Sequence, residues 1–215
     1  MKVTLLRLDG LDAAMIAASC CVSPEMPTEP KPAGLYRAVH AGHLSVLEHV
    51  VATFAVEGIS RACSHQLVRH RLASYSQQSQ RYAPLDWTDG AYVIPESVDE
   101  MNKVCSYCNL MGEIWTLYSE LISAGVPEED ARYVLPNACS TNIVVTVNAR
   151  ELRHMAEERM CSRAQWEIRE LVSEMVRLAK EKAPVLLGDA GPKCIRLGYC
   201  PEARSCGRTP RRGER

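Results

Sequence analysis

The sequence predicts an α+β domain, within the broader α/β class, with a central mixed sheet flanked by helices. Segments in which apolar residues alternate with period two are interspersed with segments of helical spacing. Of the 215 residues, 47% are hydrophobic and 24% are charged, which is typical of a globular chain that buries a core. Because the chain has no repeat and no low-complexity tract, we expect one compact domain.

The first half of the chain is expected to contain two strands and three helices. A proline-rich loop over residues 23–34 separates the first two helices. Ser60 is a good N-cap for the third, because its hydroxyl can accept a hydrogen bond from the first helical turn. The expected strands are residues 2–8 and 49–58, and the expected helices are residues 11–19, 35–42 and 61–70.

The second half continues the alternation of strands and helices. Gly125 is expected to end a long helix, because glycine tolerates the left-handed backbone that follows a last turn. Ser162 and Gln165 match a capping box that opens the last helix, and Pro184 ends it. The expected helices begin at residues 98, 127, 148 and 162, and the expected strands are residues 91–95 and 141–147.

Charge and composition exclude several classes of protein. The formal net charge is -1 with a pI near 6.6, so the chain has no basic field for nonspecific nucleic-acid binding. No apolar run approaches the roughly 20 residues that a membrane span requires, and the N-terminal segment is interrupted by charges. We therefore expect a cytoplasmic protein that contacts neither membrane nor nucleic acid, with its ten cysteines as thiols.

Hydrogen-bond donors are concentrated in the segment RHRLASYSQQSQRY, residues 69–82. On a helix that begins after Ser60, the side chains of Gln66, Arg69 and His70 share one face and lead into the Ser/Gln-rich part. Arginine binds phosphate bidentately, while serine and glutamine suit sugar hydroxyls and the edge of a heterocycle. The segment is either a nucleotide site or a solvated polar loop with cations at a helix C-terminus.

A second informative segment begins at Asn148, which is expected to cap a helix. Arg150 and His154 share one face of this helix, while Arg159 continues an apolar stripe on another. A long arginine in such a stripe either extends out to solvent or meets a buried anion, because an unpaired buried guanidinium is costly. A ligand could supply that anion.

Five separated motifs resemble those of the flavin-dependent thymidylate synthases. Residues 69–82 are similar to that family's signature, which reads Arg-His-Arg, a variable spacer and Ser-x-Arg-Tyr. The other motifs follow in the family's order: HAGHLSVLEH at 40–49, VLP at 134–136, TVNAR at 146–150 and AQWEIRE at 164–170. A lone Arg-His-Arg would be a weak match, whereas five motifs across residues 40–170 make a specific one.

The resemblance implies a reaction and its cofactors. Members of this family methylate dUMP to dTMP with methylenetetrahydrofolate as carbon donor, FAD as redox cofactor and NADPH as reductant. The reduced flavin supplies the hydride, so no enzyme cysteine is required as a nucleophile. C5 of uracil reacts only when negative charge develops on the ring, and by family analogy Arg159 is the catalytic cation that stabilises this charge.

The resemblance also assigns binding residues by position. The implied substrate contacts are Gln66, Arg69, Gln77, Ser79, Arg81, Arg132 and Arg159. The implied cofactor contacts are His43, Ser45, Arg69, His70, Arg71, Gln77, Asn148, Arg150 and His154. Some members carry glutamate where this chain has Gln77, and an amide can bind but cannot act as a carboxylate base.

The implied assembly is a homotetramer with shared active sites. The chain has no Gly-x-Gly-x-x-Gly motif after a strand, so FAD is not expected in a Rossmann crevice. In this family FAD lies between subunits. We expect residues 1–193 to form the synthase domain and residues 194–215 to form a cysteine-containing tail.

Several cysteines and histidines invite other interpretations. His40, His43 and His49 lack the carboxylates that would complete a typical zinc site, so no metal is expected there. In the tail, Cys194, Cys200 and Cys206 could hold a metal with a fourth ligand from elsewhere, but their equal spacing is not that of a zinc knuckle. We favour packed thiols.

Two other function classes remain open from the residues alone. A histidine phosphoesterase would use an Arg-His pair, but it normally needs a glycine after the histidine, where this chain has Arg71. A noncatalytic nucleotide-binding or RNA-binding module would explain the arginines but not the later motifs. Stoichiometric flavin distinguishes the synthase from both alternatives.

Overall fold

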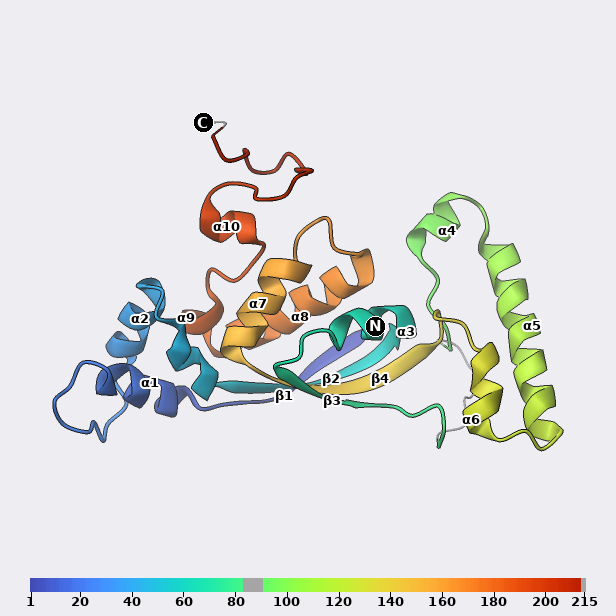
Figure 1. Ribbon diagram of the computed structural model, residues 1–215, viewed down its shortest axis with the longest axis horizontal. Helices are drawn as coiled ribbons and strands as arrows, with labels where there is room; N and C mark the ends of the chain where they lie inside the picture. The colour runs from blue at the N-terminus through green and yellow to red at the C-terminus, as the bar shows by residue number, and fades with distance from the viewer. Residues whose placement is uncertain (83–90, 214–215) are drawn as a thin grey trace. The chain divides into compact units, whose positions relative to one another are not determined.

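The computed structural model describes residues 1–82 and 91–213 and contains one antiparallel four-stranded sheet (Figure 1). The strands are β1 (Lys2–Asp9), β2 (Val51–Ser60), β3 (Ala73–Gln77) and β4 (Ser140–Asn148), in the order β1-β2-β4-β3. The α+β class is confirmed, but the expected mixed sheet is wrong. Strands β2 and β4 bury alternate residues, the pattern of an antiparallel sheet with one covered face.

Helices account for most of the remaining described chain. None of those in the described ranges combines the length and hydrophobicity needed to cross a membrane. The α-helices are α1 (Leu11–Cys20), α2 (Pro32–His40), α3 (Arg61–Leu67), α4 (Glu96–Glu100), α5 (Val104–Ser123), α6 (Glu128–Ala131), α7 (Ala149–Arg159), α8 (Trp166–Lys182), α9 (Pro184–Leu187) and α10 (Lys193–Leu197). Two 3-10 helices are η1 (Leu44–His49) and η2 (Arg132–Val134).

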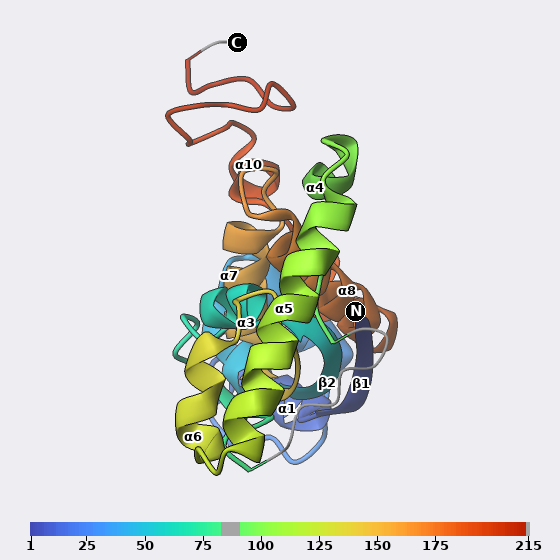
Figure 2. The same cartoon turned by 90° about the vertical axis from the view of Figure 1, so that its right-hand side faces the viewer.

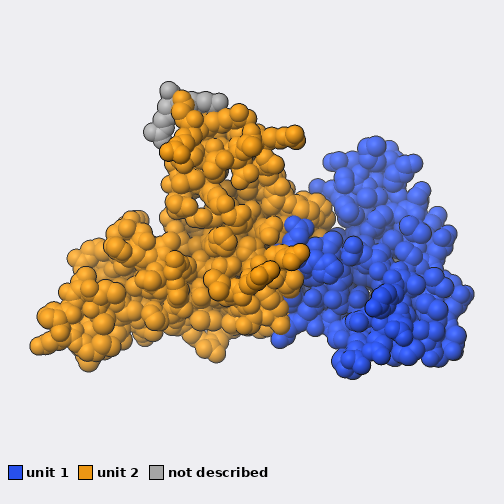
Figure 3. Space-filling model, in the orientation of Figure 1, with its two compact units in different colours: residues 1–2, 56–66, 76–143 blue, residues 3–55, 67–75, 144–215 orange. Residues whose placement is uncertain are grey.

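The chain divides into two compact units (Figure 3). Unit 1 comprises residues 1–2, 56–66 and 76–143, and unit 2 comprises residues 3–55, 67–75 and 144–215. Each of the four strands has residues in both units.

Unit 2 contains the larger part of the apolar core. Helices α7 and α8 lie over one face of its strands (Figures 1 and 2). Phe54, the only phenylalanine in the chain, is fully buried on β2, and Leu152 and Met155 are fully buried on α7. Each such side chain stabilises the fold by about 1.5–3 kcal/mol relative to exposure. The opposite face of the same strands carries Thr53 and Thr146, whose hydroxyls are 3.1 Å apart, and the exposed Val144.

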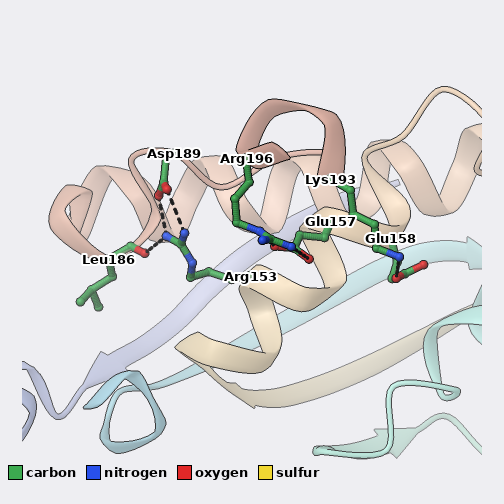
Figure 4. Close-up of polar contacts among 7 residues, drawn as sticks. All are labelled: Arg153, Glu157, Glu158, Leu186, Asp189, Lys193 and Arg196. Carbon is green, nitrogen blue, oxygen red and sulfur yellow. Dashed lines mark hydrogen bonds and ion pairs between the residues drawn. The ribbon is translucent and has the colours of Figure 1, made fainter. Parts of the chain in front are cut away.

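A buried arginine on α7 forms hydrogen bonds with α9 and with the segment that follows it (Figure 4). Arg153 is 7% exposed and donates to the carbonyl oxygen of Leu186 at 2.7 Å. It also makes two hydrogen bonds with the Asp189 carboxylate, at 2.6 and 3.0 Å. The pKa of Asp189 is lowered by these hydrogen bonds, which outweigh the opposing effect of partial burial.

Glycine is required where β1 turns into α1. Gly10 has a φ of 91°, and an added Cβ would lie 2.0 Å from the carbonyl oxygen of His49. Both the left-handed backbone and the close approach exclude a side chain at this position.

Helix caps were predicted with mixed success. The hydroxyl of Ser60 accepts from the amide of Cys63 at 2.9 Å, as expected for the N-cap of α3. The Asn148 cap on α7 is also confirmed, with a 2.8 Å hydrogen bond from the amide of Glu151. The cap of α8 is Gln165, which accepts from the amide of Ile168 at 3.1 Å, and not the expected Ser162.

Other element boundaries differ from expectation. Helix α3 ends at Leu67, so Arg69 and His70 lie beyond it and do not share a helical face with Gln66. The Ser/Gln-rich part that follows forms β3. Asn102, with a φ of 53°, lies between α4 and α5, where one continuous helix was expected. Residues 91–95 form no strand, although Tyr92 bridges to Cys139.

Candidate active site

A buried histidine is the centre of the candidate site in unit 2. His70 follows α3, and its side chain is 6% exposed. Its Nδ1 lies 3.2 Å from Oε1 of Glu151, in the first turn of α7. Its Nε2 lies 3.0 Å from Nε of Arg159, the last residue of α7. Glu151, His70 and Arg159 therefore form one continuous hydrogen-bonded chain, which we name the Glu-His-Arg chain.

The Glu-His-Arg chain fixes the tautomer of the imidazole. The Nε–H of Arg159 can only donate, so Nε2 of His70 must be the acceptor and Nδ1 must carry the proton that is donated to Glu151. The pKa of His70 is lowered mainly by burial and then by the positive charge of Arg159, against the opposing effect of Glu151. His70 is therefore neutral, and it holds Arg159 through an uncharged acceptor.

A tyrosine fixes the backbone that carries His70. The hydroxyl of Tyr75, on β3, donates to the carbonyl oxygens of Leu67 at 2.8 Å and His70 at 2.9 Å. Burial, and then the negative charge of Glu151, raises the pKa of Tyr75 to about 12. The hydroxyl therefore keeps its proton at neutral pH, and the turn between α3 and β3 is held in place.

His154 approaches the same histidine from the exposed face of α7. The two rings meet edge to face with their centroids 5.9 Å apart. Ligand atoms of His70, Glu151 and His154 lie within 4.8 Å of one another, so a metal site was considered. Both ring nitrogens of His70 are already in hydrogen bonds, and the guanidinium of Arg159 would repel a second cation. We assign no metal to this group.

The remaining predicted cofactor residues of unit 2 lie on exposed segments. Arg69 and Arg71 are exposed and make no ion pair within the described ranges. Arg150 is also exposed and pairs with Glu48 on η1. His43 and Ser45 line a cavity of about 960 Å³ between α1, α2 and η1.

Unit 1 holds the predicted phosphate-binding residues. The guanidinium of Arg81 pairs with the carboxylate of Glu129 at 2.7 Å, and Arg132 donates to the carbonyl oxygen of the same glutamate at 3.0 Å. The hydroxyl of Ser79 accepts from the amide of Arg81 at 3.1 Å. Glu129 thus brings Arg81 and Arg132 together, and Gln66 lies half-buried at the C-terminal part of α3.

Gln77 makes internal contacts. Its amide nitrogen donates to the hydroxyls of Ser64 at 2.9 Å and Thr141 at 3.3 Å. Both partners belong to unit 1. These bonds orient the side-chain amide and leave its carbonyl oxygen as the group that can meet a ligand.

Arg61 is a candidate that the sequence analysis missed. One terminal nitrogen donates to the carbonyl oxygen of Gln78 at 2.9 Å, while its buried Nε has no hydrogen-bond partner in the described residues. Burial is the main cause that lowers the pKa of Arg61, and the charge of Arg132 adds to it. The sequence could have indicated Arg61 as a site residue, because it is the first residue of the helix that contains Gln66. Arg61 and Arg132 therefore form a positive region suited to an anion.

The guanidinium groups of unit 1 are chemically suited to a phosphorylated ligand, and Arg159 of unit 2 is suited to a polar ring that gains negative charge. A family model described as "Thymidylate synthase complementing protein" matches residues 7–185. The flavin-dependent thymidylate synthase of Geobacter sulfurreducens is 46% identical over 220 residues, which cover 97% of this chain and 94% of that relative. The protein of the same name from Thermococcus onnurineus is 51% identical over 175 residues, covering 78% of this chain and 71% of that one.

A solved structure supports the same fold. The flavin-dependent thymidylate synthase of Helicobacter pylori, crystallised with FAD and dUMP, aligns with a TM-score of 0.70 at 23% identity. The alignment covers 89% of this chain and all of that chain. This chain belongs to the flavin-dependent thymidylate synthase family.

Proposed function

We propose that this chain methylates dUMP to dTMP, with methylenetetrahydrofolate as carbon donor, FAD as cofactor and NADPH as reductant. Family membership supports the reaction, and the Glu-His-Arg chain supports the role of Arg159. The hydrogen bond to His70 uses Nε of Arg159 and leaves both terminal nitrogens available to a ligand.

Arg159 is proposed to activate the uracil ring. C5 attacks a one-carbon unit only as negative charge develops over N3 and its neighbouring carbonyl groups. A guanidinium held in place before the reaction stabilises this charge without reorganising. The link to neutral His70 supports this role, because it orients the cation without neutralising it.

The phosphate of dUMP is proposed to bind among the arginines of unit 1. Arg81 and Arg132 both contact Glu129, and Arg61 lies near enough to Arg132 to feel its positive charge. The chemistry of this donor set fits a phosphate dianion, since guanidinium groups bind phosphate oxygens bidentately. The full proposed substrate set is Gln66, Arg69, Gln77, Ser79, Arg81, Arg132 and Arg159, with Arg61 added.

The residues available for FAD fit an anionic, aromatic cofactor. Arg69 and Arg71 are exposed cations without ion pairs in the described ranges, and both suit a pyrophosphate. When bound, the reduced flavin would supply the hydride. The proposed cofactor set is His43, Ser45, Arg69, His70, Arg71, Gln77, Asn148, Arg150 and His154. We infer that His70 acts mainly by holding Arg159, because its ring is buried.

Two thiols of unit 1 are poorly suited to act as nucleophiles, in keeping with a reaction without an enzyme cysteine nucleophile. Cys63 and Cys139 are fully buried. Burial raises the pKa of Cys139 despite the opposing charge of Arg61, so the reactive thiolate is disfavoured.

The assembly and organisation of the chain remain proposals. We propose a homotetramer in the cytoplasm, with residues 1–193 as the synthase domain and residues 194–215 as a tail.

An anaerobic absorbance experiment tests the proposed function. The purified chain is mixed with FAD, then reduced by NADPH with and without dUMP. We expect stoichiometric flavin bands that bleach faster when dUMP is present, followed by dTMP when methylenetetrahydrofolate is added. A chain that binds dUMP but no flavin would instead be a noncatalytic nucleotide-binding module.

A further inference from the structure

Four cysteines line one small cavity in unit 2. Cys161 lies just after α7, Cys194 lies on α10, and Cys200 and Cys206 lie in the tail beyond it. The cavity that they share is about 40 Å³. The three tail cysteines need a fourth ligand from elsewhere in the chain to complete a metal site. Cys161, which is 33 residues before Cys194 in the sequence, supplies a fourth thiol.

Ion pairs hold α10 against α7 beside this cavity (Figure 4). Arg196 pairs with Glu157 at 2.7 Å, and Lys193 pairs with Glu158. The hydrogen bond from Lys193 lowers the pKa of Glu158. Both carboxylates that α7 presents to the cavity are therefore paired with a cation, and they add no unpaired negative charge to it.

Backbone contacts bring the end of the tail back to the same place. The amide of Cys200 donates to the carbonyl oxygen of Pro210 at 2.8 Å, and Cys200 bridges to Arg211. Arg163, which also lines the cavity, donates to the carbonyl oxygen of Arg204 at 3.0 Å. These contacts join the segment after Cys206 to Cys200 and the segment before it to Arg163, while the last described residues stay exposed.

The residue that follows Cys161 has a buried hydroxyl without a regular hydrogen bond. The side-chain oxygen of Ser162 is buried and forms no regular hydrogen bond among the described residues. It lies close to the thiol of Cys206. A hydroxyl in this position could donate to a metal-bound sulfur.

The spacing of the sulfur atoms distinguishes between kinds of metal centre. A single zinc ion with bonds of about 2.3 Å draws four thiolates to about 3.8 Å from one another. In the described residues, one group of three possible ligands has all its ligand atoms within 4.8 Å of one another, and it consists of His70, Glu151 and His154. The sulfur atoms of the four cysteines form no group as close as this. In a four-iron cluster each thiolate binds a different iron atom, so the sulfurs stand farther apart around a central space.

The charges near the cavity also suit such a cluster. Four thiolates with a four-iron, four-sulfide core carry net negative charge. Arg163 and Glu202 both line the cavity and pair with each other at 3.9 Å, and the segment after Cys206 carries Arg208, Arg211 and Arg212. The three tail arginines are exposed cations close in sequence to Cys206, and they can compensate part of the negative charge of such a cluster.

We propose that Cys161, Cys194, Cys200 and Cys206 bind an iron–sulfur cluster of the four-iron, four-sulfide type. On binding, each thiol loses its proton and forms one sulfur–iron bond, with no change in the oxidation state of the cysteine. The cluster would cross-link the tail to the end of α7, two residues after Arg159. This inference does not depend on the proposed reaction.

Metal analysis of the full-length chain tests the proposal. The chain is purified anaerobically from iron-supplemented cells, and its iron, zinc and acid-labile sulfide are quantified. We expect about four iron and four sulfide per chain, together with a low-temperature paramagnetic signal after dithionite reduction that differs from a flavin radical.

Matched variants assign the ligands. Cys161→Ser and Cys200→Ser should each lower iron and sulfide at least fivefold, whereas Cys105→Ser, on an exposed α5 residue outside the cavity, should keep both. Circular dichroism identifies any variant that fails to fold, and in that case the wild-type analysis decides alone. One zinc per chain without sulfide, disulfides among the four cysteines, or no metal after anaerobic reconstitution with iron and sulfide would each overturn the proposal.

Discussion

Nε of Arg159 donates a hydrogen bond to Nε2 of His70 across 3.0 Å. Through this contact, the neutral and buried imidazole of His70 holds Arg159 in place. The two terminal nitrogens of Arg159 stay available to a ligand. Glu151 completes the arrangement by accepting the imidazole proton on the other side. The carboxylate therefore acts on Arg159 only through His70, and we classify Glu151 as a positioning residue.

Replacing Glu151 should separate positioning from binding. In Glu151→Gln, we expect turnover to fall about tenfold, or about 1.4 kcal/mol, with FAD affinity unchanged. Loss of the carboxylate removes the influence that raises the pKa of His70, so the acid limb of the pH–rate profile should move to lower pH. Glu170→Gln, on the exposed side of α8, is the matched control. A uniform loss of activity with an unmoved acid limb would assign Glu151 a purely structural role.

Acidification should destabilise unit 2 through His70. The pKa of His70 is lower in the folded chain than the 6.5 of an unperturbed histidine, so below pH 6.5 the unfolded chain binds more protons. The stability that neutral His70 contributes is fully present above pH 6.5. It is lost as the pH falls through the pKa of His70 in the folded chain. Urea unfolding between pH 7 and 5 should thus show a smaller pH slope in His70→Asn than in the wild type. The exposed His65→Asn serves as control, and equal slopes in all three proteins would contradict the prediction.

The ion pair between Arg153 and Asp189 should contribute more to the free energy of unfolding than an ion pair on the surface does. In Arg153→Met, we expect the free energy of unfolding to fall by about 2 kcal/mol, because the carbonyl oxygen of Leu186 loses its charged donor. The estimate is below that for a fully buried pair because the Asp189 side chain is 63% exposed. Arg177→Met removes two exposed pairs on α8, with Glu174 and Glu181, and should lower the free energy of unfolding much less than Arg153→Met. Chemical denaturation of both variants makes the comparison, and equal losses would refute it.

Two substitutions in unit 1 should change nucleotide affinity in opposite directions. Arg81→Ala should weaken dUMP binding about tenfold by removing a phosphate donor, with flavin binding kept. Glu129→Gln should tighten dUMP binding, because a carboxylate 2.7 Å from Arg81 competes with the phosphate and repels it. Calorimetric titrations with dUMP measure both. If both variants bind dUMP more weakly, Glu129 orients Arg81 and does not compete.

The sequence predicted β1, β2 and β4 and the caps of α3 and α7. Asn148 and Ser60 cap their helices because the bond from side chain to backbone closes within one turn. The sheet direction was missed because alternation of side chains does not encode which strand is the neighbour. The break at Asn102 was also missed, since the apolar spacing continues on both sides of it.

The site was predicted only in part, because its partners come from distant segments. Arg159 and His70 were both singled out, but nothing in their local patterns pairs residues 89 positions apart. Glu151 was not singled out from the sequence as the partner of His70. The fourth cysteine of the proposed cluster, Cys161, was missed for the same reason, since it is far from the tail in sequence.

The most direct test of the account is a single-turnover measurement of dTMP formation with Arg159→Ala. The variant is loaded with FAD, reduced anaerobically, and mixed with saturating dUMP and methylenetetrahydrofolate, beside the wild type and the exposed Arg177→Ala control. Loss of the cation that stabilises the uracil ring should slow dTMP formation at least about a hundredfold, or about 2.7 kcal/mol, with flavin content unchanged. An unchanged single-turnover rate would contradict the central role of Arg159.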